Sequence, residues 1–172
     1  MPNKFDAIVI GAGQAGPPLA NRLATSGMKV AFAERKLFGG TCVNTGCTPT
    51  KTMVASAYAA HVARRGADYG FNISGDVTVD MQKVKARKDQ IVNKSSSSVE
   101  SWLRDNKNIT VFKGHARFVS PKEVEVDGNR LSFIDAGVIR VPAGSLAQRM
   151  RAILDGLGTV IATTVPHRAA IE

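Results

Sequence analysis

The sequence is short of cysteine, of aromatic residues and of long hydrophobic runs. Its two cysteines are too few for a disulfide framework, and their spacing matches no structural zinc site. No hydrophobic run approaches the roughly 20 residues of a membrane-spanning helix, and the first run is too short and too closely followed by glycine for a signal peptide. We therefore expect a cytoplasmic protein with no metal site and no membrane contact.

Acidic residues are scarce, since 14 Asp and Glu stand against 23 Lys and Arg, which gives a net charge of +9. Such an excess raises the hypothesis of nucleic-acid binding. The densest basic patch, residues 83–88, lies in a segment whose buried positions are expected at helical spacing. The expected buried stripe consists of Val84, Ile91, Ser95, Val99 and Trp102. The basic side chains then form a solvated face, and because no aromatic-rich strand accompanies them, we expect no nucleic-acid partner.

The two cysteines, Cys42 and Cys47, are only five positions apart. A disulfide that closes so short a loop restricts the unfolded chain by only about 2 kcal/mol, which is weak support for a structural role. A redox-active pair is one interpretation, and two free, inert thiols in a reducing cytosol are the alternative. Cα atoms at this spacing lie about 8.6 Å apart in a regular helix. A disulfide needs roughly 4.4–6.8 Å, so pairing requires a break in the helix, for which Gly46 is best suited.

A helix is expected to follow the second cysteine, over residues 51–65. Pro49 is tolerated in a first helical turn, and Thr48 is a candidate N-cap. Cys47 would then lie near a helix N-terminus, where the helix dipole and Lys51 stabilise a thiolate.

A glycine-rich motif lies upstream of the cysteines. Residues 5–10 have the composition of a buried parallel strand, and they lead directly into the G-x-G-x-x-G formed by Gly11, Gly13 and Gly16. In a βα turn of this kind the first glycine permits the tight turn, the second lets the backbone approach a pyrophosphate, and the third allows close helix–strand packing.

A second strand, residues 29–34, ends in Glu34, eighteen residues after Gly16. A carboxylate at this place can accept hydrogen bonds from the ribose hydroxyls of a dinucleotide. Arg35 leaves open a second possibility, because a basic neighbour can accommodate a 2′-phosphate. Strand, glycines, helix, strand and acid in this order predict a dinucleotide site.

Together the two motifs resemble the N-terminal FAD-binding segment of the class I pyridine nucleotide–disulfide oxidoreductases, which include glutathione reductase, dihydrolipoyl dehydrogenase and mercuric reductase. The resemblance covers residues 5–127, and its most specific part is G-G-T-C-V-N-x-G-C-x-P-x-K. The ending T-P-T-K-T-M and the later segment G-H-A-R-F are most similar to the mercuric-reductase-like branch.

The resemblance implies FAD at the glycine motif and at Glu34, and it implies roles for further residues. Gly40 and Thr41 would lie along the pyrophosphate, Lys51 near the reactive flavin nitrogen, and Ala116 against the adenine. Cys42 would be the thiol that attacks the substrate, and Cys47 the thiol that faces the flavin. The family's histidine base comes from a C-terminal domain that the resemblance does not include, so we expect no catalytic role for the three histidines, His61, His115 and His167.

The expected fold is α/β: a Rossmann-like βαβ unit with a parallel sheet, plus a small antiparallel β-meander. Strands are expected at residues 108–113, 123–126 and 130–133, with Asp127-Gly128 as a hairpin turn. We expect an FAD-binding domain over residues 1–130 and a divergent segment over 131–172. In that segment residues 143–157 could form a basic helix, and residues 160–166 only faintly resemble the family's next FAD-contacting strand.

The activity implied by the resemblance is electron transfer from NAD(P)H through FAD to a Cys42–Cys47 disulfide, and then to a disulfide substrate or a soft metal ion such as Hg(II). The family's homodimer and its nicotinamide-binding domain would require a longer chain. The alternative is a truncated FAD-binding fragment without catalytic activity.

Overall fold

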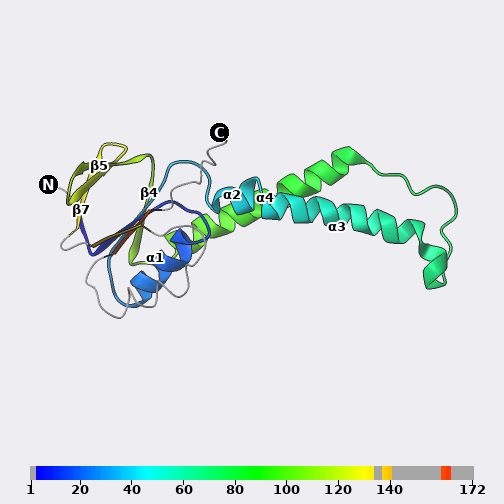
Figure 1. The fold of residues 1–172 in the computed structure, drawn as a ribbon, viewed down its shortest axis with the longest axis horizontal. Coiled ribbons are helices and arrows are strands. Elements are labelled where there is room, and N and C mark those ends of the chain that lie inside the picture. Colours follow the sequence, from blue (N-terminus) through cyan, green and yellow to red (C-terminus); the bar gives the residue numbers. More distant parts are fainter. Residues whose placement is uncertain (1–2, 134–136, 141–159, 164–172) are drawn as a thin grey trace, which may run out of the picture.

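The computed structural model describes residues 3–133, 137–140 and 160–163. They form two sheets, with helices against the larger one (Figure 1). All pairings in the larger, five-stranded sheet are parallel. In spatial order its strands are β4 (Ile109–Lys113), β3 (Val30–Glu34), β2 (Ala7–Ile10), β9 (Val160–Thr163) and β8 (Gly137–Arg140). The strand order reverses at β2, so the turn that follows this strand lies where parallel α/β sheets bind ligands.

The smaller sheet has four strands in the order β1-β7-β6-β5. Their bounds are β1 (Asn3–Phe5), β7 (Asn129–Phe133), β6 (Glu123–Val126) and β5 (Ala116–Ser120). β5, β6 and β7 form the expected antiparallel meander, and β1 adds to it in parallel. The predicted hairpin turn is confirmed, because Asp127 and Gly128 join β6 to β7 with φ values of 48° and 80°.

The helices follow one another along the chain as α1 (Gly16–Thr25), α2 (Gly40–Asn44), α3 (Cys47–Arg64), the 3-10 turn η1 (Gly66–Tyr69) and α4 (Met81–Arg104). α1 connects β2 to β3, while α2, α3 and α4 together connect β3 to β4. α3 and α4 lie side by side and extend well beyond the sheets (Figure 1). Along this hairpin several large hydrophobic side chains are exposed, among them Met53, Val54 and Tyr58.

Side chains from the two faces of the parallel sheet belong to two separate hydrophobic clusters. Val9 and Phe32 pack with Leu19 and Leu23 of α1 and Leu103 of α4. On the other face the alternate residues pack under the meander; these are Ile8, Ala31 and Ala33, together with Phe5, Val124, Val126, Leu131 and Phe133. The predicted α/β fold with a parallel sheet and a meander is therefore confirmed, and it has three layers.

The strand expected over residues 5–10 is divided between the two sheets. β1 ends at Phe5, and Asp6 then redirects the chain, since its carboxylate accepts a hydrogen bond of 2.7 Å from the Lys29 N–H and its own N–H donates to the Lys29 carbonyl at 2.8 Å. Phe5 consequently packs under the meander rather than extending β2.

Two expectations about helices were wrong in detail. Trp102 was placed in the buried stripe of α4 but is 45% exposed, whereas its neighbour Leu103 is fully buried. Thr48 does not cap α3, because the helix begins one residue earlier, at Cys47, with Gly46 in the N-cap position and no side-chain cap bond. The reason is the break after α2, which brings the chain into helical geometry before Thr48 is reached.

The boundary expected after residue 130 falls within β7, and β8 and β9 both belong to the parallel sheet. Residues 160–163, which only faintly resemble the family's next FAD-contacting strand, pair directly with β2. The basic helix expected over residues 143–157 lies outside the described residues. That residues 131–172 are divergent stays a prediction.

Candidate functional site

The turn between β2 and α1 is closed by contacts that only glycine permits. Gly11 has a φ of 103°, and its N–H donates to the Ala33 carbonyl at 2.8 Å, which holds the turn against β3. A Cβ atom on Gly16 would lie closer to the Gly11 carbonyl oxygen than the 3.0 Å that such atoms keep. Pro17 and Pro18 occupy the first positions of α1, where neither needs an N–H. The backbone therefore has no room for a side chain at Gly16, where α1 begins.

The segment that carries the cysteines begins in contact with this turn. The Gly39 N–H donates to the Ala12 carbonyl at 2.8 Å, and Gln14 Nε2 donates to the Gly39 carbonyl at 3.3 Å. A Cβ atom on Gly40 would lie 2.8 Å from Gly13 Cα, and Gly40 itself has a φ of 59°. The two sequence motifs, separated by more than twenty residues, thus form one site at the end of β2.

Glu34 connects this site to the neighbouring strands. Its carboxylate accepts hydrogen bonds from the backbone N–H groups of Ala12, at 2.6 Å, and Lys36, at 2.7 Å. Its carbonyl accepts from the Gly114 N–H at 2.9 Å, which brings the segment leading to Ala116 next to β3. Ala116 itself is half-buried at the start of β5, and Arg35 is exposed.

Cys42 and Cys47 lie on two different helices that meet at Gly46. α2 ends at Asn44, and Gly46 turns the chain with φ −122° and ψ −107°. A Cβ atom on Gly46 would lie 3.0 Å from the Thr41 carbonyl oxygen and 3.5 Å from Cys42 Cα, so the chain passes close to α2 before α3 begins. The expected break in helical geometry is confirmed. Both cysteines are free thiols, Cys42 half-buried and Cys47 exposed.

The side chain of Cys47 is the main influence on the acidity of Cys42. The hydrogen bond to the Cys47 side chain, then burial, then the charge of Cys47 raise the pKa of the Cys42 thiol. The Cys47 N–H and the positive charge of Lys51 oppose this shift but are outweighed. The Cys42 thiol is therefore harder to deprotonate than an ordinary thiol, so a nearby base would assist its action as a nucleophile.

The loop that precedes α2 is held at Phe38 by two side chains that were not among the predicted site residues. The Phe38 carbonyl accepts one hydrogen bond from Asn44 Nδ2, at 2.9 Å, and another from Ser96 Oγ of α4, at 2.8 Å. Asn44 is part of the cysteine motif, so its presence there was a signal. Ser96 belongs to a run of four serines, residues 95–98, and no local pattern indicates its partner.

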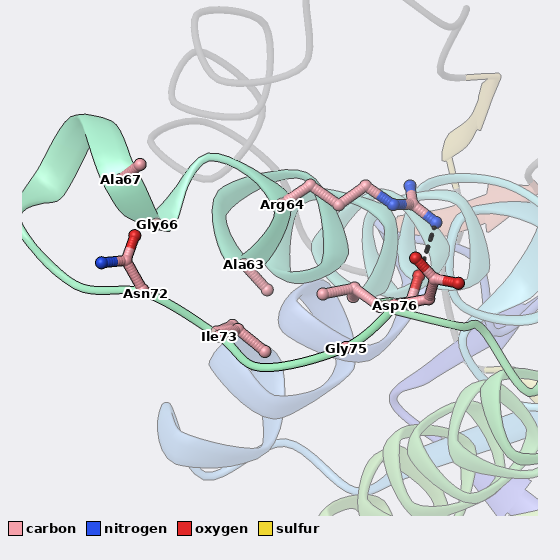
Figure 2. Close-up of a pocket in the computed structure, with 9 residues that line it drawn as sticks. Ala63, Arg64, Gly66, Ala67, Asn72, Ile73, Gly75 and Asp76 are labelled. Carbon is pink, nitrogen blue, oxygen red and sulfur yellow. Dashed lines mark hydrogen bonds between the residues drawn. The ribbon is translucent and has the colours of Figure 1, made fainter.

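Two cavities lie away from the cysteines. One, of about 480 Å³, lies where α3 ends and is open to solvent. In Figure 2 Arg64 extends toward the segment of Gly75 and Asp76, and its Nη2 donates to the Val77 carbonyl at 3.1 Å. Arg64 is about 26 Å along α3 from Cys47, at 1.5 Å per residue, so this cavity takes no part in thiol chemistry. The other, of about 680 Å³, lies between α1 and Trp102.

Two classes of site are missing from the part of the chain that the structure describes. No three His, Cys, Asp or Glu side chains there are grouped so that they could hold a metal ion. Within the same residues, no helix combines the length and the hydropathy required to cross a bilayer.

Residues 5–155 match the family model described as pyridine nucleotide-disulphide oxidoreductase. The chain belongs to this family. Over 99% of its length it is 34% identical to the dihydrolipoyl dehydrogenase of Chlamydia muridarum, and over 72% it is 40% identical to that of Thermus scotoductus. A solved structure, the Cu(II) complex of the HOCl-induced flavoprotein disulfide reductase RclA from Escherichia coli, aligns with 76% of the chain at 31% identity and a TM-score of 0.60.

The chain spans only part of these family members, namely 38% of the Chlamydia enzyme, 26% of the Thermus enzyme and 27% of RclA. Membership in the pyridine nucleotide–disulfide oxidoreductases, expected from the two motifs, is confirmed. The closer likeness to mercuric reductases stays a prediction, since the relatives named here are dihydrolipoyl dehydrogenases and a flavoprotein disulfide reductase.

Proposed function

We propose that this chain forms the FAD-binding part of a disulfide oxidoreductase and carries its redox-active cysteine pair. The observation that supports this most strongly is the contact between Gly40 and Gly13, because it places the thiols beside a turn built for a pyrophosphate. When bound, FAD supplies a two-electron carrier between a reduced nicotinamide and the cysteines. A cytoplasmic location accords with a disulfide that is catalytic rather than structural.

The residues present fit this cofactor. The turn carries no side chain at Gly11, Gly13 or Gly16, and neither Gly16 nor Gly40 has room for one, so the backbone there is free of side chains that would keep a pyrophosphate away. Glu34 presents a carboxylate at the end of β3 for the ribose, with Arg35 beside it, and Ala116 offers its backbone to the adenine. Thr41 lies in the first turn of α2, next to Gly40, and would lie along the pyrophosphate. Lys51, whose charge reaches the Cys42 thiol, belongs at the flavin end of the site.

The cysteine pair supports thiol–disulfide exchange. In the reducing direction the Cys42 thiolate bonds to one sulfur of a disulfide substrate, the substrate S–S bond breaks, and its other half leaves as a thiol. Cys47 then attacks Cys42, which forms the Cys42–Cys47 disulfide and releases the second thiol. The raised pKa of Cys42 implies that its proton must be taken by a base that the substrate or another part of the protein brings.

A soft metal ion is the second candidate substrate, and the free, adjacent thiols favour it. Two thiolates in contact are suitable ligands for Hg(II) or a copper ion. The RclA structure was determined as a Cu(II) complex, which makes copper a reasonable first ion to test. A catalytically inactive FAD-binding fragment remains the alternative, and the experiment below distinguishes it.

The test is to purify the 172-residue chain with FAD and to record its absorbance after reduction with a dithiol. We expect weak flavin retention at most, and in the flavin-bearing fraction a long-wavelength thiolate–flavin band that Cys47→Ser removes and Cys42→Ser preserves. Failure to retain flavin in both variants and in the unmodified chain would contradict FAD binding. A band that survives in Cys47→Ser would contradict the assignment of Cys47 as the thiol next to the flavin. Bleaching by NADPH is not expected, because the family's nicotinamide-binding domain would require a longer chain. Retained flavin without a thiolate–flavin band in the unmodified chain would identify an inactive FAD-binding fragment.

A further inference from the structure

α4 is fixed in the body of the protein at its C-terminal end. Leu103 is fully buried in the cluster between the parallel sheet and α1, and Val99, one turn earlier, packs against the same cluster. Just beyond the helix, Asn106 Nδ2 donates to Asn21 Oδ1 of α1 at 2.8 Å. The remainder of α4 runs outward beside α2 and α3 (Figure 1). A helix held in this way is a rigid reference for the segments that it touches.

The first of these segments is the loop that begins α2. Ser96 Oγ donates to the Phe38 carbonyl at 2.8 Å, across 58 residues of sequence. The same carbonyl accepts from Asn44 Nδ2, so α4 and α2 hold one peptide group between them. Phe38 is fully buried, and Gly39 and the start of α2 follow it at once. Ser96 therefore fixes the helix that carries Cys42.

The second segment is the first part of α3. Arg87 Nη1 donates to the Thr52 carbonyl at 3.1 Å and to Ser56 Oγ at 3.3 Å. Thr52 is the one polar residue found buried in the described part of the chain, and its hydroxyl donates to the Thr48 carbonyl in the first turn at 2.8 Å. Arg87 thus holds the helix that begins at Cys47.

Ser96 and Arg87 stand nine residues apart, or about 13.5 Å along α4. Each of the two cysteine-bearing helices is therefore bonded to the same rigid helix, one on either side of the junction at Gly46. Because the thiols belong to separate helices, their relative position depends on how α2 and α3 are held and not on the peptide link alone.

We propose that Ser96 and Arg87 are positioning residues for the cysteine pair, which keep Cys42 and Cys47 close enough to form and break a disulfide. This inference rests on the proposed redox role of the pair. Holding two thiols together raises their effective concentration toward each other. Loss of either anchor lets one helix move, so the disulfide forms less readily and is reduced at a less negative potential.

The experiment equilibrates the full 172-residue chain with glutathione and glutathione disulfide at fixed ratios and measures the Cys42–Cys47 disulfide by mass spectrometry after acid quenching. The exchange is balanced: the dithiol and one glutathione disulfide give the protein disulfide and two glutathione thiols. We expect Ser96→Ala and Arg87→Ala each to lower the equilibrium constant about fivefold, which corresponds to about 20 mV for a two-electron couple. Because the anchors act on different helices, the double variant should show about the product of the two effects.

Two matched controls come from the same helix. Ser98 belongs to the same serine run but donates only to the Lys94 carbonyl of its own helix, so Ser98→Ala removes a hydroxyl without touching α2. Lys85 pairs with Asp89, so Lys85→Ala removes one positive charge, as Arg87→Ala does, without touching α3. Both controls should stay within twofold of the unmodified chain. Ser96→Thr retains a hydroxyl, so its equilibrium constant should lie close to that of the unmodified chain. This variant keeps the test valid even if Ser96→Ala folds poorly.

The outcomes separate this inference from the function on which it rests. If the unmodified chain forms the disulfide and Ser96→Ala and Arg87→Ala behave like Ser98→Ala and Lys85→Ala, the positioning role is wrong while the redox pair stands. If the unmodified chain forms no Cys42–Cys47 disulfide at any glutathione ratio, the redox function itself is wrong. A loss in the two anchor variants alone supports the proposal.

Discussion

The contact between the cysteine segment and the glycine turn can be tested by adding one methyl group. In Gly40→Ala the new Cβ would lie 2.8 Å from Gly13 Cα, whereas ordinary van der Waals contact begins at 3.4 Å. The neighbouring atom belongs to the backbone of a turn fixed by hydrogen bonds from Gly11 and Gly39, so it cannot rotate away. The turn must open by about 0.6 Å, and overpacking of this kind costs about 1–3 kcal/mol.

Gly40 also has a φ of 59°, which costs an alanine about 1–2 kcal/mol in addition. Gly27 provides the control, because its φ of 93° is also positive and no atom lies within 4 Å of the position of its Cβ. Gly27→Ala therefore reports the backbone cost alone. The expected losses in free energy of unfolding are about 3 kcal/mol for Gly40→Ala and about 1 kcal/mol for Gly27→Ala.

Urea unfolding followed by circular dichroism measures both losses. The difference of about 2 kcal/mol corresponds to roughly 4–8 °C in Tm for a domain of this size. Gly40→Ala should also weaken flavin retention, since it separates the two halves of the site, whereas Gly27→Ala should retain flavin normally. Equal destabilisation by the two substitutions would refute the close approach of Gly40 to Gly13.

Two further predictions concern the thiols and α4. Because the pKa of Cys42 is raised mainly by the Cys47 side chain, the pH midpoint of its alkylation by iodoacetamide should lie above that of an ordinary thiol. Cys47→Ala should lower this pH midpoint and speed alkylation at pH 8. An unchanged pH midpoint would contradict the influence of Cys47 on Cys42. Leu103→Ala should lower the free energy of unfolding in urea by about 2–5 kcal/mol, because Leu103 is fully buried. Trp102→Ala should lower it by less than half as much, because Trp102 is 45% exposed. The reverse order would mean that Trp102 is the buried residue, as the helical spacing predicted.

The sequence predicted the elements whose signals are local. The unit from β2 through α1 to β3 follows from apolar runs and glycines within thirty residues, and the turn at Asp127 follows from two residues alone. The sequence could not show that Asp6 divides the first strand, because the cause is a pair of hydrogen bonds to Lys29, the residue that precedes β3. For the same reason the partners of Ser96 and Arg87 were not predictable, since they lie 58 and 35 residues away.

The placement of the buried stripe on α4 illustrates a second limit. A period of 3.6 residues fixes a helical face only to within a residue, and both Trp102 and Leu103 are apolar enough to complete it. Leu103 is the residue that enters the core, in the cluster that also contains Phe32 and Leu23. Trp102 is left outside, where it lines the cavity with Pro18 and Arg22.

Glu34 has a structural role that does not depend on any ligand. Its carboxylate accepts a hydrogen bond from the Ala12 N–H. The Ala12 carbonyl in turn accepts one from the Gly39 N–H at the start of the cysteine segment. Residues 34, 12 and 39 thus form a continuous series of hydrogen bonds from the expected ribose end of the site to the helix of Cys42. Glu34→Gln would remove one of the two carboxylate acceptors and so disturb this series as well as the proposed ribose contact. If the series carries the effect, this variant should change the Cys42–Cys47 exchange equilibrium in the absence of flavin, whereas a pure ribose contact would leave that equilibrium unchanged.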